Sequence, residues 1–360
     1  MIKKIGVLTG GGDAPGLNGV IRAVVKTALH DYNLEVVGFL DGFSGLVKNN
    51  YQVLTIDKVS GILHKGGTIL GTNNRDNPFR FPVIENGEKL YQDLSAEVLK
   101  NLAQLGVDVL VVIGGDGTLS IARDFSEKGV KVIGVPKTID NDLEATDVTF
   151  GFDTAVTTAT EALDKLHTTA ESHHRMMILE VMGRYGGWIA LYSGIAGGAD
   201  VILIPEIPYD LKKVKLKIEE RKTQGKLFSI IVVAEGAQPI NGQMTVAKMI
   251  EGSSDPVRLG GVGQVVAEQL AQLTGLEARV TVLGHLQRGG SPTASDRILA
   301  TRFGVKAVEQ AIKGPWGTMV ALRGQEIVCV QLAQAVQQLK RIDPQGELIK
   351  AARSTGICFG

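Results

Sequence analysis

Two apolar runs that end in polar loops decide the fold: VDVLVVIGGDGT at 107–118 and VKVIGVPKTIDND at 130–142. Continuous runs of Val, Ile and Leu are typical of parallel strands buried on both faces. Because ligands of open α/β sheets bind where parallel strands end, the GGDGT and TIDND loops are expected at one carboxyl edge. The sequence therefore predicts a parallel sheet with a polar site at that edge.

The two loops carry the groups that phosphoryl transfer to an alcohol needs. Glycines let the backbone approach phosphate oxygens, and Asp116 follows them where it can face a magnesium ion. Asp140 and Asp142 would repel each other and divide their tasks, one accepting the hydroxyl proton. Asp116 could instead be a turn carboxylate capping a helix that begins near Ser120, and a solvated acidic turn would explain TIDND alone.

A third loop, TGGGDAPG at 9–16, lies between an apolar run and a helical pattern. Open glycine amides and a helix N-terminus favour an anion. Its glycine spacing departs from GxGxxG, which disfavours a nicotinamide cofactor, and a tight turn without a ligand is the alternative. The chain has no GxxxxGK[ST] sequence, so we expect a phosphate cradle built from several loops.

Composition narrows the class of protein. The 360 residues carry 38 basic and 38 acidic side chains, which gives no support to a nucleic-acid or membrane-surface partner. Two cysteines without CxxC spacing indicate neither a disulfide framework nor a zinc site, as is typical of the cytoplasm. No apolar stretch reaches the roughly 18 residues that a membrane helix requires.

Short apolar runs alternate with helix-length segments along the chain, which predicts α/β architecture with two doubly wound, mainly parallel-sheet domains. The expected strands are 2–9, 35–40, 107–113, 130–135, 175–182, 200–205, 227–234 and 279–283. Pro15 suits the first turn of a helix that follows, and Ser95 is expected to cap a helix over 96–105. The segment 236–264 is predicted to be a long loop.

The ordered motifs resemble those of the phosphofructokinase family over most of the chain. They are GGGDAPGLN (10–18), GGDGT, TIDND, SHHR (172–175), EVMGRYGGW (180–188), VILIPE (201–206), VLGHLQRGGSP (282–292) and DRILATRFG (296–304). The resemblance implies phosphoryl transfer from ATP to the C1 hydroxyl of fructose 6-phosphate, in glycolysis, with the active site in the cleft between two domains. It implies a donor domain of 1–151 plus 286–337, a sugar-phosphate domain of 152–285 and a C-terminal tail of 338–360.

The resemblance also assigns roles to residues. Asp140 is the expected base, supported by Thr138, Asp142 and Arg184, and Asp116 is the expected magnesium ligand. The residues expected around the donor are Gly11, Arg75, Gly115, Asp116, Gly117, Thr118 and Lys137. Those expected around the sugar phosphate are Thr138, Ile139, Asp140, Arg175, Met182, Gly183, Arg184, Glu235, Arg279, His285 and Arg288.

Three arginines and a histidine also suit a phosphate dianion on physical grounds, because arginine presents a planar fork to it. A solvated charged face, or a packed histidine at 285, is the alternative. In the family two of these arginines come from a neighbouring subunit, at the positions of Arg175 and Arg279. The resemblance therefore implies a homo-oligomer, and we favour a tetramer over a dimer.

The donor signature is divided. The common bacterial nucleotide enzymes of the family have glycine at both of two positions, whereas the pyrophosphate enzymes have aspartate at the first and lysine at the second. In this chain the first position is Gly117 and the second is Lys137. We weight Gly117 more, because an aspartate there would crowd and repel an α-phosphate whereas a lysine can swing aside. ATP is the expected donor, with pyrophosphate and ADP as alternatives.

The family also has an allosteric effector site built from arginines and lysines, and the residues at the matching positions here are Arg22, Lys26, Lys58, His167, Lys226 and Leu227, so only some of the charges are kept. Two other functions compete with the main interpretation. A lipid or NAD kinase would explain GGDGT but not TIDND, and a non-catalytic nucleotide-sensing subunit would have no need of Asp140.

Overall fold

The computed structural model describes residues 2–85, 87–249 and 257–360. The chain forms two compact units. The first consists of Met1–Ile139, Leu143–Asp153 and Arg288–Leu339, and the second of Asp140–Asp142, Thr154–Gln287 and Lys340–Gly360. The separate C-terminal tail expected at 338–360 is wrong, because residues 340–360 belong to the second unit. Within that unit, Ile202 donates a backbone hydrogen bond to Cys358 (2.9 Å).

The first unit is built on a seven-stranded sheet in the order β15-β14-β7-β6-β1-β2-β3. Its strands are β1 (Lys4–Thr9), β2 (Glu35–Phe39), β3 (Tyr51–Val53), β6 (Val109–Gly114), β7 (Val132–Pro136), β14 (Thr318–Arg323) and β15 (Glu326–Gln331). The five inner strands pair in parallel, while β3 and β15 pair antiparallel at the two edges. The predicted parallel sheet is confirmed.

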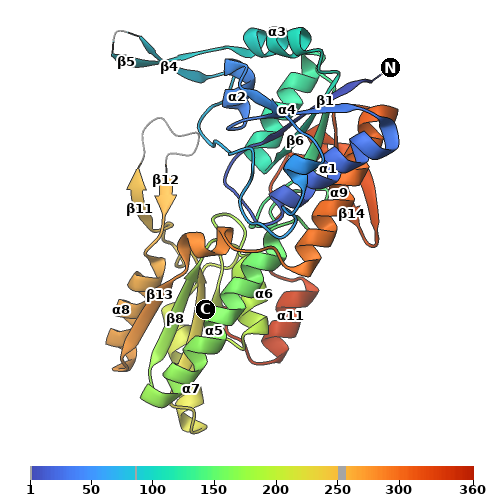
Figure 1. Ribbon diagram of the computed structural model, residues 1–360. Coiled ribbons are helices and arrows are strands. Elements are labelled where there is room, and N and C mark those ends of the chain that lie inside the picture. The colour runs from blue at the N-terminus through green and yellow to red at the C-terminus, as the bar shows by residue number, and fades with distance from the viewer. Residues whose placement is uncertain (1, 86, 250–256) are drawn as a thin grey trace. The chain divides into compact units, whose positions relative to one another are not determined.

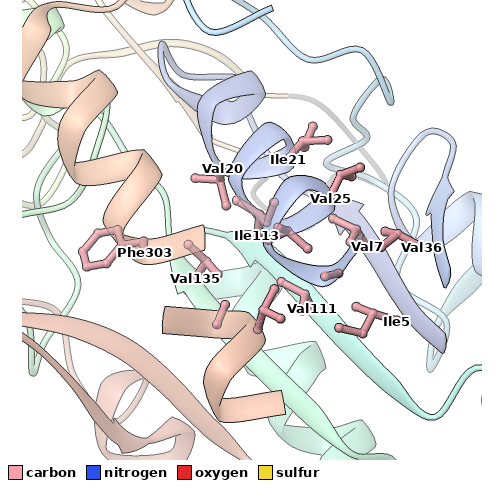
Figure 2. Packing of buried hydrophobic residues seen from close by; sticks show 14 of the residues in the cluster. Ile5, Val7, Val20, Ile21, Val25, Val36, Val111, Ile113, Val135 and Phe303 are labelled. Carbon is pink, nitrogen blue, oxygen red and sulfur yellow. The ribbon is translucent and has the colours of Figure 1, made fainter. Parts of the chain in front are cut away.

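Helices cover both faces of this sheet, and their bounds are α1 (Leu17–Tyr32), α2 (Phe43–Lys48), η1 (Asp57–Val59), α3 (Ser95–Leu105), α4 (Asp116–Glu127), α9 (Ala294–Lys313) and α10 (Leu332–Ala335). Helices α1 and α9 lie side by side (Figure 1). Figure 2 shows Val20, Ile21 and Val25 of α1 above Ile5 and Val7 of β1, all in one buried cluster. This apolar packing holds the carboxyl edge of the sheet and its loops in place.

The second unit has a parallel four-stranded sheet in the order β13-β8-β10-β9. Its strands are β8 (Met176–Val181), β9 (Val201–Leu203), β10 (Ser229–Ala234) and β13 (Ala278–Val282). Helices α7 (Leu211–Thr223) and α8 (Val262–Thr274) pack on one face through Val214, Ile218, Val266 and Leu270. The other helical segments are α5 (Phe152–His173), α6 (Trp188–Ala196), η2 (Gly284–Arg288) and α11 (Glu347–Ser354).

Two hairpins complete the fold: β4 (Phe81–Glu85) with β5 (Glu88–Gln92), and β11 (Val246–Met249) with β12 (Val257–Leu259). The loop expected over 236–264 therefore contains a hairpin and the start of α8, and its residues 250–256 lie outside the described part of the chain. Ser95 is the first residue of α3 and not its cap, since Leu94 occupies the cap position, and the Ser95 backbone N–H donates to Asp93 Oδ1 (2.8 Å).

Candidate functional site

The glycine loop after β1 lies against the end of β6 and the loop at Asn73. Gly10 N donates to Ile113 O (2.9 Å) and Gly11 N donates to Asn73 O (3.1 Å). A Cβ on Gly10 would lie 2.7 Å from the Thr118 side chain, so a larger residue there would displace Thr118. Gly11 has φ of 77°, a conformation that favours glycine. The loop therefore needs its glycines for both packing and backbone shape.

Asp116 is the first residue of α4, and not part of a turn before a helix at Ser120. Burial raises the pKa of its carboxyl above the usual value, and Arg123 offsets this only in part. A desolvated carboxylate is stabilised by a cation, and magnesium is commonly held by one or two carboxylates together with substrate phosphates. A Cβ on the neighbouring Gly117 would meet no atom within 4 Å, so this helix start is open.

Lys137 follows β7 and is almost fully buried, with 3% of its surface exposed. Its backbone N–H donates to Gly114 O (2.9 Å), and its ammonium donates to Gly12 O in the glycine loop. The ammonium lies 3.4 Å from the position that a Cβ on Gly11 would occupy, so it points toward the glycine loop. A positive charge therefore sits inside the loop predicted to bind phosphate.

The remaining predicted residues of the first unit lie around these loops. Thr138 O accepts from Thr149 Oγ1 (2.7 Å), and Ile139 is fully buried. Arg75 is exposed, and its N–H donates to Asn73 Oδ1 (2.7 Å) beside the glycine loop. Arg288, predicted for the sugar phosphate, donates through Nη1 to Asp13 O (3.1 Å), and its guanidinium would meet a Cβ on Gly12.

In the second unit, residues 140–142 contact the chain near its C-terminal end. Lys340 N donates to Asp142 O (2.8 Å), and Lys340 Nζ donates to Asn141 Oδ1 (3.0 Å). Asn141 is 2% exposed and has φ of 51°, in the left-handed region. The directions of Asp140 and Asp142 therefore depend on a residue in an uncommon backbone conformation.

The Met182–Arg184 loop and Glu235 follow two neighbouring strands, β8 and β10. Glu235 N donates to Val181 O (2.9 Å), and Gly236 N donates to Gly183 O (3.1 Å). Gly183 has φ of 141°, and a Cβ there would lie 2.8 Å from Gly186 O, so only glycine fits. The structure thus brings these predicted residues together at the carboxyl edge of the second sheet.

Gln287 joins this loop to the turn η2. It is fully buried, its Oε1 accepts from Met182 N (3.2 Å), and its Nε2 donates to Gly284 O (3.1 Å). His285 lies on the same turn and is exposed, so it is not the packed histidine of the alternative interpretation. The turn is held by a glutamine that the sequence analysis did not single out.

Arg175 and Arg279 lie at the opposite edge of the second sheet, where β8 and β13 begin. Arg175 Nε donates to Glu277 Oε2 (2.5 Å), and Arg279 pairs with the other oxygen of Glu277. The hydrogen bond from Arg175 holds the pKa of Glu277 below its usual value. Since β8 has six residues, Arg175 and Met182 are separated by about 20 Å along the strand. The structure does not bring these arginines to the sugar-phosphate residues of their own unit.

Nothing among the described residues forms a group of three or more His, Cys, Asp or Glu side chains able to hold a metal. A magnesium ion would therefore depend on Asp116 together with donor phosphates, which is a common arrangement for this ion. No helix in the described part of the chain is long and apolar enough to cross a membrane.

Comparison with known proteins places this architecture in a family. A family model described as Phosphofructokinase matches residues 4–311. The chain is 58% identical over 360 residues to ATP-dependent 6-phosphofructokinase 2 of Clostridium perfringens, covering 99% of this chain and 98% of that protein. It is 51% identical over 342 residues to a pyrophosphate--fructose 6-phosphate 1-phosphotransferase of Amycolatopsis methanolica, covering 95% of this chain and 97% of that protein.

A solved structure of Pichia pastoris phosphofructokinase in the T-state has a TM-score of 0.80 and 32% identity to this chain. The match covers 99% of this chain and 37% of that one, so the present chain spans little more than a third of its length. The glycine loop, GGDGT, TIDND and the turn η2 all fall within the matched residues 4–311. With its doubly wound sheets and these loops at their carboxyl edges, the chain belongs to the phosphofructokinase family.

Proposed function

We propose that the protein transfers the γ-phosphoryl group of ATP to the C1 hydroxyl of fructose 6-phosphate, giving fructose 1,6-bisphosphate and ADP. The observation that carries this proposal is the course of residues 136–142. Lys137 contacts the glycine loop of the first unit, and three residues later Asp140 begins the segment that belongs to the second. Chain reach alone keeps the Cα atoms of these two residues within about 11 Å.

Each half of the reaction has its own residues. The glycine loop, Gly115, Gly117, Thr118 and Arg75 would hold the donor phosphates, and Asp116 would hold Mg²⁺. When bound, the ion would neutralise charge on the donor phosphates. Asp140 would take the proton of the C1 hydroxyl, with Thr138, Asp142 and Arg184 beside it. Met182, Gly183 and Glu235 would orient the sugar, and His285 and Arg288 would bind its 6-phosphate.

Arg175 and Arg279 are proposed to complete the sugar-phosphate site of a neighbouring subunit. Their place about 20 Å along the strand from Met182 supports this, because side chains cannot span that distance. A homo-oligomer is then required for activity, and we favour a tetramer over a dimer. We also place the enzyme in cytoplasmic glycolysis, with an effector site that includes Lys226 and Leu227. Both residues line a cavity of about 110 Å³.

Pyrophosphate is the second candidate donor, because the resemblance gives a lysine at the position of Lys137 to the pyrophosphate enzymes of the family. The buried ammonium would pair with a phosphate in the glycine loop, whether that phosphate belongs to a nucleotide or to pyrophosphate. The Clostridium relative is named ATP-dependent and the Amycolatopsis relative is named for pyrophosphate. ATP is preferred because the higher identity is to the ATP-dependent relative and because Gly117 leaves open space at the start of α4.

The test is a donor panel of ATP, ADP and pyrophosphate at equal Mg²⁺ with fructose 6-phosphate, in which fructose 1,6-bisphosphate is measured directly. We expect the highest kcat/KM with ATP. A higher value with pyrophosphate or ADP would replace the donor but keep the reaction. Absence of product with all three donors would leave the nucleotide-sensing alternative.

A further inference from the structure

The C-terminal segment 340–360 lies beyond the residues that the family model matches. It is nonetheless an integral part of the second unit. Cys358 N donates to Asp200 O (3.0 Å), and Ile349, Ala352 and Phe359 are buried. The segment is therefore anchored to the second unit at its far end. Its first residue, Lys340, is held by contacts of its own.

Lys340 is fixed on both sides of its backbone. Its N–H donates to Asp142 O (2.8 Å), and its carbonyl accepts from Trp188 Nε1 (3.0 Å). Its ammonium donates to Asn141 Oδ1 (3.0 Å) and lies 5.4 Å from the centre of the Trp188 ring. Main chain and side chain of one residue thus contact two successive residues of the TIDND loop.

The contacts of Lys340 can influence the direction of Asp140 through Asn141. It separates the two carboxylates of the loop and has φ of 51°, which asparagine tolerates better than most residues but which still needs support. A change in its backbone angles would turn Asp140 relative to the rest of the loop. The hydrogen bond from the ammonium opposes that change, because it holds the buried asparagine side chain.

We propose that Lys340 is a positioning residue for catalysis, which acts through Asn141 and Asp142 to keep Asp140 aimed at the sugar hydroxyl. This inference rests on the proposed function of Asp140. The ammonium also brings a positive charge to a loop with two carboxylates and so reduces their mutual repulsion. Displacement of a reacting group by about 1 Å can cost a factor of about 10² in rate, so a contact of this kind matters for turnover.

The test compares Lys340→Met, Lys340→Arg and a matched control, Lys350→Met. Lys350 is an exposed lysine of the same C-terminal segment. We expect Lys340→Met to lower kcat by about 10- to 100-fold with the KM for ATP kept within about two-fold, because only the loop is disturbed. Lys340→Arg keeps the charge and a donor, so it should recover part of kcat. Lys350→Met should match the unmodified protein.

Hydrogen exchange supplies a readout that is independent of activity. Peptides covering 139–143 should exchange faster in Lys340→Met than in Lys350→Met, while peptides of β8 and β10 stay unchanged. Trp188→Phe removes the hydrogen bond to the Lys340 carbonyl and keeps the ammonium, so it should lower kcat in the same direction but less.

The outcomes separate the two claims. An unmodified protein that phosphorylates no fructose 6-phosphate overturns the proposed function. An active protein in which Lys340→Met and Lys350→Met have equal kcat and equal exchange at 139–143 overturns only the role of Lys340. A loss in Lys340→Met that comes with faster exchange throughout the second unit would show a merely structural role and would also overturn it.

Discussion

At the scale of single residues, Asp140 is the proposed catalytic base. Asp140→Asn keeps the shape of the side chain but cannot take a proton, so kcat should fall by about 10²- to 10⁴-fold with the KM for fructose 6-phosphate largely kept. Steady-state kinetics measure both constants. Asp31→Asn, an exposed aspartate at the end of α1, is the control and should leave them unchanged. Near-normal turnover in the Asp140 variant would remove this residue from the role of base.

Asp116 is predicted to lower the stability of the ligand-free protein and to be needed for activity. Because its pKa is raised in the fold, the stability that this group contributes falls as pH rises through the window between its unfolded and folded pKa values. Asp116→Asn should therefore raise the melting temperature of the ligand-free protein at neutral pH. It should also reduce kcat/KM with ATP by about 10²-fold or more, since the proposed Mg²⁺ ion would lose its protein ligand. A melting temperature that falls instead would contradict the effect of burial.

We propose that Lys137 and Gly117 together determine which phosphoryl donor the protein uses. Lys137→Met keeps most of the buried stem and removes the charge in the glycine loop, so the ratio of kcat/KM for ATP over pyrophosphate should rise by about 10-fold or more. Gly117→Asp has room for its side chain and should abolish the use of ATP by repelling its α-phosphate. The same donor panel measures both variants. If the unmodified protein prefers pyrophosphate to both nucleotides, Lys137 outweighs Gly117.

At the scale of the elements, the parallel direction of β8 and β13 separates two groups of residues that are predicted to bind the sugar phosphate. Met182 and His285 follow the strands, whereas Arg175 and Arg279 come at their starts, where Glu277 pairs with both. In the proposed function each guanidinium must leave Glu277 in order to bind a sugar phosphate. Glu277 would then compete with the substrate, and the hydrogen bond from Arg175 holds the pKa of this carboxyl below its ordinary value.

Glu277→Gln is expected to lower the KM for fructose 6-phosphate by about two- to five-fold, the scale of exposed ion pairs. In the unmodified protein the two ion pairs persist above the ordinary pKa of a glutamate and are lost as pH falls through the lowered pKa. Glu219→Gln, which breaks an exposed pair with Lys215 on α7, is the matched control. A raised KM in the Glu277 variant would show that this carboxylate orients the arginines for the substrate and does not compete with it.

At the scale of the whole molecule, a shared site predicts complementation between subunits. Asp140→Asn protein and Arg279→Ala protein should each have little activity alone. After subunit exchange, a mixed oligomer contains some sites with both residues intact, so activity should return to about a quarter of the unmodified level when exchange is random. Mass spectrometry of the intact oligomer checks that exchange has occurred. Proven mixed oligomers without recovery would contradict a shared site.

Most of the buried parallel strands, and the loops predicted to bind phosphate, follow from local sequence, whereas the buried parallel strand β14 was not predicted. β1, β6, β7, β8 and β10 are predominantly apolar, because a strand covered on both faces buries nearly all of its side chains. The antiparallel edge strands β3 and β15 are partly exposed and lack that signal, and the sequence analysis did not predict them. The hairpin of β4 and β5 was missed for the same reason.

Only the tertiary structure shows what supports the candidate site. Lys340 and Asn141 are separated by 199 positions, Gln287 and Met182 by 105, and Lys137 and Gly12 by 125. A single lysine or glutamine has no periodicity and no motif, so nothing near it in the chain distinguishes a solvated side chain from a buried partner. The order of apolar runs and glycine turns specified the sheets and the loops at their edges. The long-range packing of those sheets decided which side chains hold the loops in position, because such contacts form only once distant segments have been brought together.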